Sequence, residues 1–96
     1  GMSKAWLIGH ITVKDAAKWA EYRARVPATL APFGAELSFR GTLARVLAGN
    51  HRHTDVVVAG FPDRAALEAW HASAAYQALI PLRTEAAEVD LLSYDI

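Results

Sequence analysis

The first third of the chain has the apolar pattern of a strand followed by a helix. Residues 5–12 are largely apolar on both faces of an extended backbone, which predicts a strand in the centre of a sheet. Asp15 is a candidate N-cap for a helix. Beyond it, apolar residues recur three or four positions apart and predict one buried helix face: Ala16, Trp19, Tyr22, Val26 and Leu30.

Pro27 lies inside this predicted helix. Proline lacks a backbone N–H and its ring clashes with the preceding turn, so we expect a kink or a split at this point. Pro32, Phe33 and Gly34 follow, and Gly34 is expected to cap the C-terminal end of the helical segment.

The middle of the chain predicts a long second strand over residues 36–47. Strand alternation places Leu37 and Phe39 on one face and Arg40 on the other. Glycine inside a strand is typical of a bulge or a sharp bend, and we expect one at Gly41.

The remaining elements follow from strong turn and cap signals. A turn at residues 49–50 leads into an apolar strand at 55–61, so the second and third strands form a predicted hairpin. Asp63 is expected to begin a helix, Ser73 to begin a further helical segment, and residues 89–96 to form the last strand.

The predicted order is strand, helix, strand, strand, helix, strand. This order is typical of an α+β, ferredoxin-like (βαββαβ) domain, in which a four-stranded antiparallel sheet carries both helices on one face. The other sheet face is then bare, although its strands are rich in apolar residues. We therefore expect two copies to pack sheet against sheet in a homodimer.

Length and composition are consistent with a single domain that shares a surface. The chain has 96 residues, of which 53% are apolar, slightly above the usual ~45–50%. Gly1 precedes Met2 and is typical of a tag remnant, so the expected domain covers residues 2–96. Ten basic residues balance ten acidic ones with no basic stripe, which disfavours a nucleic-acid partner.

Several other classes of protein are disfavoured. The absence of cysteine excludes disulfides, cysteine–zinc sites and thiol catalysis. The apolar runs are far shorter than the ~18 residues that span a bilayer, so no membrane association is expected. No charged segment followed by an apolar one opens the chain, and a cytoplasmic location is the expectation.

A set of short motifs occurs in the order typical of one family. They are Trp6-Leu-Ile-Gly-His10, Tyr22 with Pro27, Phe33-Gly34, Arg40-Gly41, Leu47-Ala-Gly49, residues 56–62, Trp70, Ser73, Tyr76 and Arg83. Together they resemble DUF1330, a bacterial family of unknown function in the dimeric α/β-barrel group of ferredoxin-like folds. The resemblance implies a homodimer whose sheets form a barrel, and it implies no established reaction. Relatives in the wider fold group include cofactor-free monooxygenases, haem-degrading enzymes, isomerases and dehydratases, so the fold alone carries no function.

Two arginines are candidates for binding an anion. The guanidinium of Arg40 could hold a carboxylate or enolate through two hydrogen bonds, as the family match also suggests, or it could pair with an acid of the protein. Arg83 lies at the end of an apolar helix face. It could reach the same pocket, or it could interact with a helix C-terminus.

His10, Tyr22, Trp70 and Tyr76 are the other candidate site residues. A buried neutral His10 could act as a general base near pH 7, although a lone histidine on an apolar face is more often structural. The hydroxyls of Tyr22 and Tyr76 could orient a ligand or be satisfied within the core. Trp70 is expected to be core and to form apolar wall of a pocket.

The sequence carries no motif for a metal or an organic cofactor. His51 and His53 could share one face of a strand, but a metal site normally needs three or more ligands and no third is apparent from spacing. The glycine-rich motifs of dinucleotide and phosphate binding are absent. We expect no cofactor and no metal.

Three hypotheses remain open, and sequence alone leaves open whether the protein is an enzyme. The first is a homodimer that binds a small organic anion between the sheet and a kinked first helix, with Arg40 as anchor and His10 as the candidate for proton transfer. The second is a cofactor-independent monooxygenase or isomerase. The third is a non-catalytic dimerisation module whose pocket is filled by side chains and whose Arg40 and Arg83 pair with acids.

Overall fold

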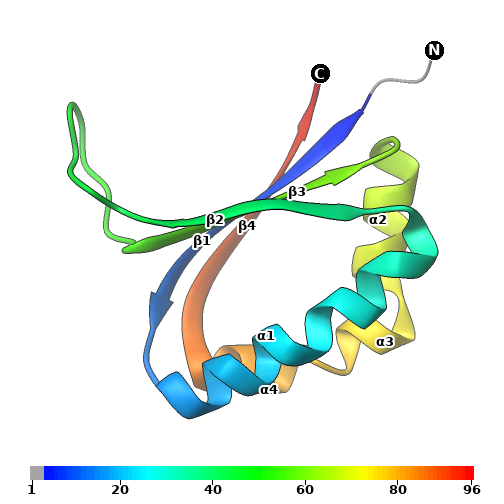
Figure 1. Cartoon of the computed structure of the whole chain (residues 1–96), viewed down its shortest axis with the longest axis horizontal. Coiled ribbons are helices and arrows are strands. Elements are labelled where there is room, and N and C mark those ends of the chain that lie inside the picture. The colour runs from blue at the N-terminus through cyan, green and yellow to red at the C-terminus, as the bar shows by residue number, and fades with distance from the viewer. Residues whose placement is uncertain (1–3) are drawn as a thin grey trace.

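A computed structural model describes residues 4–96, and the tag-remnant prediction for Gly1 lies outside them (Figure 1). Four strands form the sheet: β1 (Ala5–Val13), β2 (Glu36–Thr42), β3 (Asp55–Phe61) and β4 (Ala87–Asp95). The helical segments are α1 (Ala16–Leu30), a 3-10 turn η1 (Ala31–Phe33), α2 (Arg64–Ala72), α3 (Ala74–Gln77) and α4 (Ile80–Ala86). Within these described residues, no helix combines the length and apolarity needed to cross a bilayer.

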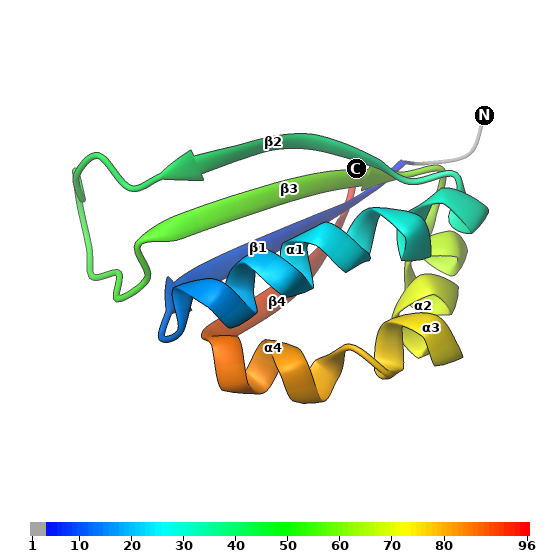
Figure 2. The ribbon, with the colours of Figure 1, turned by 60° about the horizontal axis from the view of Figure 1, so that its bottom comes forward.

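The sheet order is β2-β3-β1-β4, and every neighbouring pair is antiparallel. All helices lie on one face of the sheet, and the other face is uncovered (Figure 2). The α+β, ferredoxin-like prediction is confirmed.

Strand alternation divides the side chains of β1 between the two faces. Ala5, Leu7 and Ile11 are buried beneath the helices, whereas Ile8 and His10 on the other face are only partly buried. The core between sheet and helices closes around large side chains that are almost fully buried: Phe61, Leu67, Trp70 and Tyr76.

The predicted helix starts are confirmed by cap geometry. Asp15 accepts the backbone N–H of Lys18 at 3.1 Å, and Asp63 accepts that of Ala66 at 2.8 Å. Ser73 separates α2 from α3 with an extended backbone, and its hydroxyl caps α3. Each such cap typically stabilises a helix by ~1 kcal/mol, so these residues set where the helices begin.

The prediction at Pro27 was a kink or a split of the helix, and the split is wrong. The segment α1 continues through Pro27 to Leu30. Pro27 lies in the last turn, so its missing N–H removes one hydrogen bond, to the carbonyl of Arg23, while burial of Leu30 holds the turn against the core. Gly34 has φ of 68° and caps η1, as expected for a left-handed glycine.

The second strand is shorter than predicted and its bulge lies elsewhere. The strand β2 ends at Thr42, and the loop that follows extends away from the sheet before residues 51–54 return to it (Figure 1). The register shifts between Leu37 and Phe39, which pair with Ala59 and Val58, rather than at Gly41. One extra residue reverses the alternation, so Leu37 and Phe39 lie on opposite faces and Arg40 joins Leu37 on the helical side.

Candidate functional site

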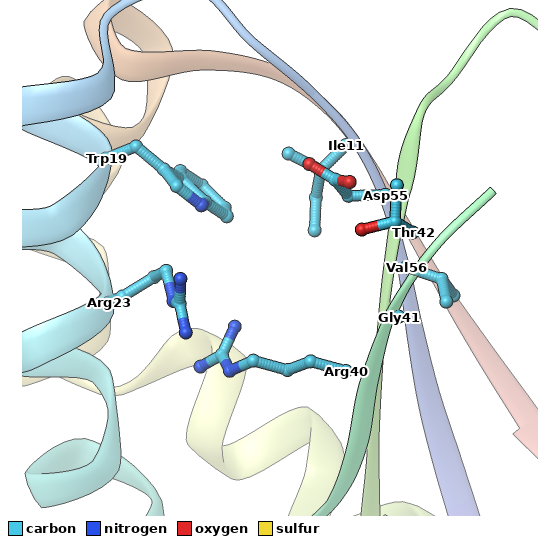
Figure 3. A pocket seen from close by; sticks show the side chains of 8 residues that line it. All are labelled: Ile11, Trp19, Arg23, Arg40, Gly41, Thr42, Asp55 and Val56. Atoms are coloured by element: carbon cyan, nitrogen blue, oxygen red, sulfur yellow. The ribbon is translucent and has the colours of Figure 1, made fainter.

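The main candidate site is a cavity of about 210 Å³ between helix α1 and the sheet (Figure 3). Trp19 and Arg23 approach it from α1, while the opposite wall comes from β1, β2 and β3. These wall residues are Ile11, Arg40, Gly41, Thr42, Asp55 and Val56. The cavity therefore combines an indole and an isoleucine with four side chains that can bind a ligand by charge or by hydrogen bonds.

Arg23 and Arg40 extend toward each other across this cavity (Figure 3). Within residues 4–96, neither guanidinium lies within ion-pair distance of an acidic side chain, although Asp55 lines the same cavity. Burial is the main cause that lowers the pKa of Arg40, and the positive charge of Arg23 adds to the effect. Two like charges without a close counter-ion favour binding of an anion, because it would relieve their repulsion.

A second, narrow cavity of about 40 Å³ lies deeper under α1. Ile11, Trp19 and Arg40 line both cavities, so the two are neighbouring parts of one site. The rest of the deeper wall is mainly apolar, and Tyr22 and Trp70 form part of it. The site as a whole has a charged outer part and a small apolar inner part.

Tyr22, Tyr76 and Arg83 form a buried hydrogen-bonded network beside the deeper cavity. The two hydroxyl oxygens are 2.8 Å apart, and Arg83 Nη1 donates to the oxygen of Tyr76 at 2.9 Å. Burial raises the pKa of Tyr22, and the neighbouring Tyr76 raises it further. Tyr22 therefore keeps its proton at neutral pH and acts as a hydrogen-bonding group rather than as a base.

Trp70 is 1% exposed and supports the inner wall. Its ring centroid lies 4.1 Å from that of Tyr76, and its Nε1 donates to Thr29 Oγ1 at 3.0 Å. The Thr29 hydroxyl in turn donates to the carbonyl of Val26 at 2.7 Å. Trp70 thus links α2 to the last turn of α1 while lining the cavity, which agrees with both of its predicted roles.

His10 lies on the opposite face of the sheet, so its predicted cooperation with Arg40 is wrong. His10 pairs with Val56 and Asp90 across the sheet, on the face that points away from the helices. Successive residues of a strand point to opposite faces, so His10 lies on the same face as Ile8. Ile11 lies on the other face and lines the Arg40 cavity. No proton transfer by His10 inside that cavity fits this geometry.

His10 instead forms a cluster with His51, His53 and Asp90. The ring of His10 lies 4.9 Å from His51 and 6.3 Å from His53 between centroids. His53 is 3% exposed, and its two nitrogens contact Thr12 Oγ1 at 2.9 Å and Asp90 Oδ2 at 2.7 Å. In the part of the chain that the structure describes, no group of three or more potential ligands has the geometry to hold a metal ion.

The structure thus brings Arg40, Tyr22 and Trp70 together around the cavities and places Tyr76 and Arg83 directly behind Tyr22. The other polar residues of the cavity were not predicted from the sequence: Arg23, Thr42 and Asp55. Trp19 was predicted as core, and it also forms part of the cavity wall. Arg23 follows Tyr22 directly, and Asp55 pairs with Ile11 in the register of β1 and β3. Helix and strand periodicity could have placed both beside the predicted pocket.

Comparison with known proteins identifies a family and several solved relatives. A family model described as "Domain of unknown function (DUF1330)" matches residues 4–94. No curated protein sequence matches the chain. A protein of unknown function from Rhodopseudomonas palustris is 15% identical, with a TM-score of 0.83 over 100% of this chain and 84% of that one.

Two further solved structures share the fold. SnoaB from Streptomyces nogalater, a cofactor-independent oxygenase, is 15% identical, with a TM-score of 0.70 over 96% of this chain and 91% of SnoaB. A dimeric ferredoxin-like protein of unknown function from Thermobifida fusca is 13% identical, with a TM-score of 0.68 over 99% of this chain and 92% of that one. At these identities the likeness establishes the fold alone.

Proposed function

The chain belongs to the DUF1330 family, and we propose that it is a homodimeric domain that binds a small organic anion between its sheet and its helices. The observation that carries the proposal is the pair Arg23 and Arg40, which face one cavity without an acidic partner within ion-pair distance among the described residues. Two guanidiniums can bind one carboxylate or enolate through several charge-assisted hydrogen bonds.

The neighbouring apolar cavity narrows the class of ligand. Its wall carries Trp19, Tyr22 and Trp70, and Arg40 lies at the boundary between the charged and apolar parts. A ligand that fills both parts has an anionic group at the outer end and a compact apolar body at the inner end. A compact ring carboxylate meets this description better than a phosphate or a multiply charged metabolite.

Binding of cyclohexanecarboxylate, compared with its uncharged amide, tests the proposal. We expect the wild type to bind the acid more tightly than the amide. Arg40→Ala should lower the affinity for the acid by about 10-fold or more, because it removes a charge-assisted hydrogen bond. Arg25→Ala is the matched control, because Arg25 lies on the same helix as Arg23 but pairs with Glu21 at the surface. Equal affinity of Arg40→Ala and wild type for the acid would reject the anion site.

The bare sheet face supports the homodimer. Phe39, Leu92 and Tyr94 project from it with exposed fractions of 54%, 39% and 49%. Trp6 and Ile8 lie beside them, since Trp6 pairs with Tyr94 and Ile8 with Leu92. A second copy that covers this face would remove an apolar surface that a monomer leaves in water.

Asp55 favours a second candidate, a cofactor-independent isomerase or monooxygenase. Its carboxylate lines the cavity with Arg23 and Arg40 and forms no ion pair within 4 Å among the described residues. Asp55 could take a proton from a carbon next to a carbonyl, leaving the electron pair on an enolate oxygen that an arginine stabilises. Return of the proton to another carbon completes an isomerisation. A monooxygenase would instead transfer the enolate electrons to O2, form a carbon–peroxide bond, and lose water after protonation to leave a second carbonyl.

Deuterium exchange in 4-oxocyclohexanecarboxylate tests this candidate. In D2O, the wild type should accelerate exchange at the carbons next to the ketone, as followed by proton NMR. Asp55→Asn should lose that acceleration, while His10→Gln should keep it because His10 lies on the other sheet face. Exchange that is unaffected by Asp55→Asn would remove Asp55 from this role.

A non-catalytic module receives less support from the cavity. That hypothesis predicts that Arg40 and Arg83 pair with acids of the protein. Within residues 4–96, neither forms an ion pair, and Arg83 instead donates to Tyr76.

A further inference from the structure

The hydroxyls of Tyr22 and Tyr76 carry two hydrogens, and only one of them is used within their network with Arg83. Arginine only donates, and each tyrosine hydroxyl carries one hydrogen. The contact between the two hydroxyls uses one of their two hydrogens, and Arg83 supplies its own to Tyr76. No other hydrogen bond to either hydroxyl occurs in the part of the chain that the structure describes, so one hydroxyl hydrogen is left without an acceptor.

Burial decides which tyrosine holds this free hydrogen. If Tyr22 donates to Tyr76, the Tyr76 oxygen accepts twice and its own hydrogen is trapped at a residue that is 0% exposed. An unsatisfied buried donor of this kind destabilises the folded state. If Tyr76 donates to Tyr22, the free hydrogen is on Tyr22, which lines the inner cavity. The second arrangement is therefore favoured.

The order of donation also strengthens the final donor. Arg83 donates to Tyr76 and Tyr76 donates to Tyr22, so each bond polarises the next hydroxyl in the chain. Arg40 lines the same inner cavity as Tyr22. One ligand in the cavity could therefore meet a guanidinium and a polarised hydroxyl donor.

We propose that Tyr22 is a specificity-determining residue that donates a hydrogen bond to a second oxygen of the ligand, a carbonyl or enolate oxygen away from the anionic group. This inference rests on the proposed function and narrows its ligand class to compact oxo acids. The plain ring acid satisfies the arginines but leaves the Tyr22 hydrogen without a partner. The oxo acid satisfies both.

The test compares 4-oxocyclohexanecarboxylate with cyclohexanecarboxylate by isothermal titration calorimetry. The wild type should bind the oxo acid about 3- to 10-fold more tightly than the plain acid, because one hydrogen bond usually contributes that much to affinity. Tyr22→Phe should abolish this preference, so that the ratio of the two affinities falls to about one. Tyr94→Phe is the matched control, because it removes a tyrosine hydroxyl on the opposite sheet face and should keep the preference. Equal affinities in wild type, or a preference that survives in Tyr22→Phe, would overturn the inference.

A carbonyl chemical shift separates this inference from the anion site and does not depend on the variant folding. Bound oxo acid labelled with carbon-13 at its ketone should show a downfield carbonyl shift in the wild type, and no shift would overturn the inference. If neither acid binds, the proposed anion site fails. Labelled cyclohexanone, which has no carboxylate, then tests Tyr22 alone: a downfield shift on wild-type protein supports the donor, and its absence rejects it.

Discussion

Asp90 Oδ2 lies 2.7 Å from Nε2 of His53, on the sheet face that the helices leave uncovered. This hydrogen bond is the main cause that holds the pKa of Asp90 below its usual value, and Arg52 adds to it. His10 lies beside the pair, and burial together with the charges of His51 and His53 lowers its pKa. Three imidazoles thus lie together on a surface proposed to be an interface, and His53 is the one that hydrogen-bonds the Asp90 carboxylate.

Acidification should destabilise the fold through His10. A histidine whose pKa is lower in the folded state binds fewer protons there than in the unfolded chain. Its contribution to stability is therefore complete above about pH 6.5 and falls as the pH drops below that value. We expect the melting temperature to fall between pH 7.5 and 5.5, and His10→Gln to reduce that slope.

The matched control for this prediction is His71→Gln, which removes a histidine from the exposed surface of α2. It should leave the pH slope of the wild type intact. A slope that is the same in His10→Gln and wild type would show that His10 does not control acid stability. Loss of the Asp90 contribution is expected only at lower pH, near and below the usual carboxylate range, because its pKa is also lowered.

Thr29→Val should destabilise the protein by about 1–3 kcal/mol although it changes the volume of the side chain little. Valine removes the oxygen that accepts the buried Nε1–H of Trp70 at 3.0 Å. Urea unfolding at constant pH measures the change, and Thr29→Ser, which keeps the hydroxyl, is the control. If the valine and serine variants are equally stable, the indole hydrogen bond contributes nothing to stability, and any loss of unfolding free energy comes from changed packing.

Gly9→Ala should also destabilise the fold, because side chains of the neighbouring strands β3 and β4 occupy the space that an added Cβ would need. A Cβ there would lie 2.8 Å from Val57 Cγ1 and 3.1 Å from Leu91 Cδ2, and overpacking of this kind costs about 1–3 kcal/mol. Gly41→Ala meets only Val56 Cγ1 at 3.5 Å, an ordinary contact, and should be neutral or slightly stabilising. Thermal unfolding of both variants measures the difference. Equal melting temperatures would show that the side chains around Gly9 accommodate the added methyl group.

Sequence signals predicted the fold best where they act locally. Asp15, Asp63 and Ser73 are caps whose partners lie three residues away, so the residue type and its position were enough. Pro27 does not split the helix, because it removes only one hydrogen bond near the helix end and Leu30 packs against the core. Local chemistry sets the start of a helix more firmly than its continuity.

The site was less predictable because it depends on register and on distant contacts. One extra residue between Leu37 and Phe39 moved Arg40 to the helical side, and no sequence signal marked that bulge. Tyr22 and Tyr76 are 54 positions apart, so their contact follows from helix packing alone. The separation of His10 from Arg40 needs the strand pairing, because alternation shows which residues share a face but not which face meets the helices.

Phe39→Glu tests the proposed dimer most directly. Phe39 lies on strand β2 at the edge of the sheet, is 54% exposed and points to the uncovered face because of the bulge. A charge there costs a monomer little, since the side chain is already in water. In the dimer it would be buried without a partner, which is strongly unfavourable.

We therefore expect the wild type to elute as a dimer in size-exclusion chromatography with light scattering, and Phe39→Glu to shift toward a monomer that remains folded by circular dichroism. Ala69→Glu places the same carboxylate on the exposed surface of α2 and should leave the dimer intact. If Phe39→Glu stays dimeric, the copies associate through another surface. A monomeric wild type would instead show that the sheet face stays open, and the cavity beside Arg40 would then have to bind its ligand within a single chain.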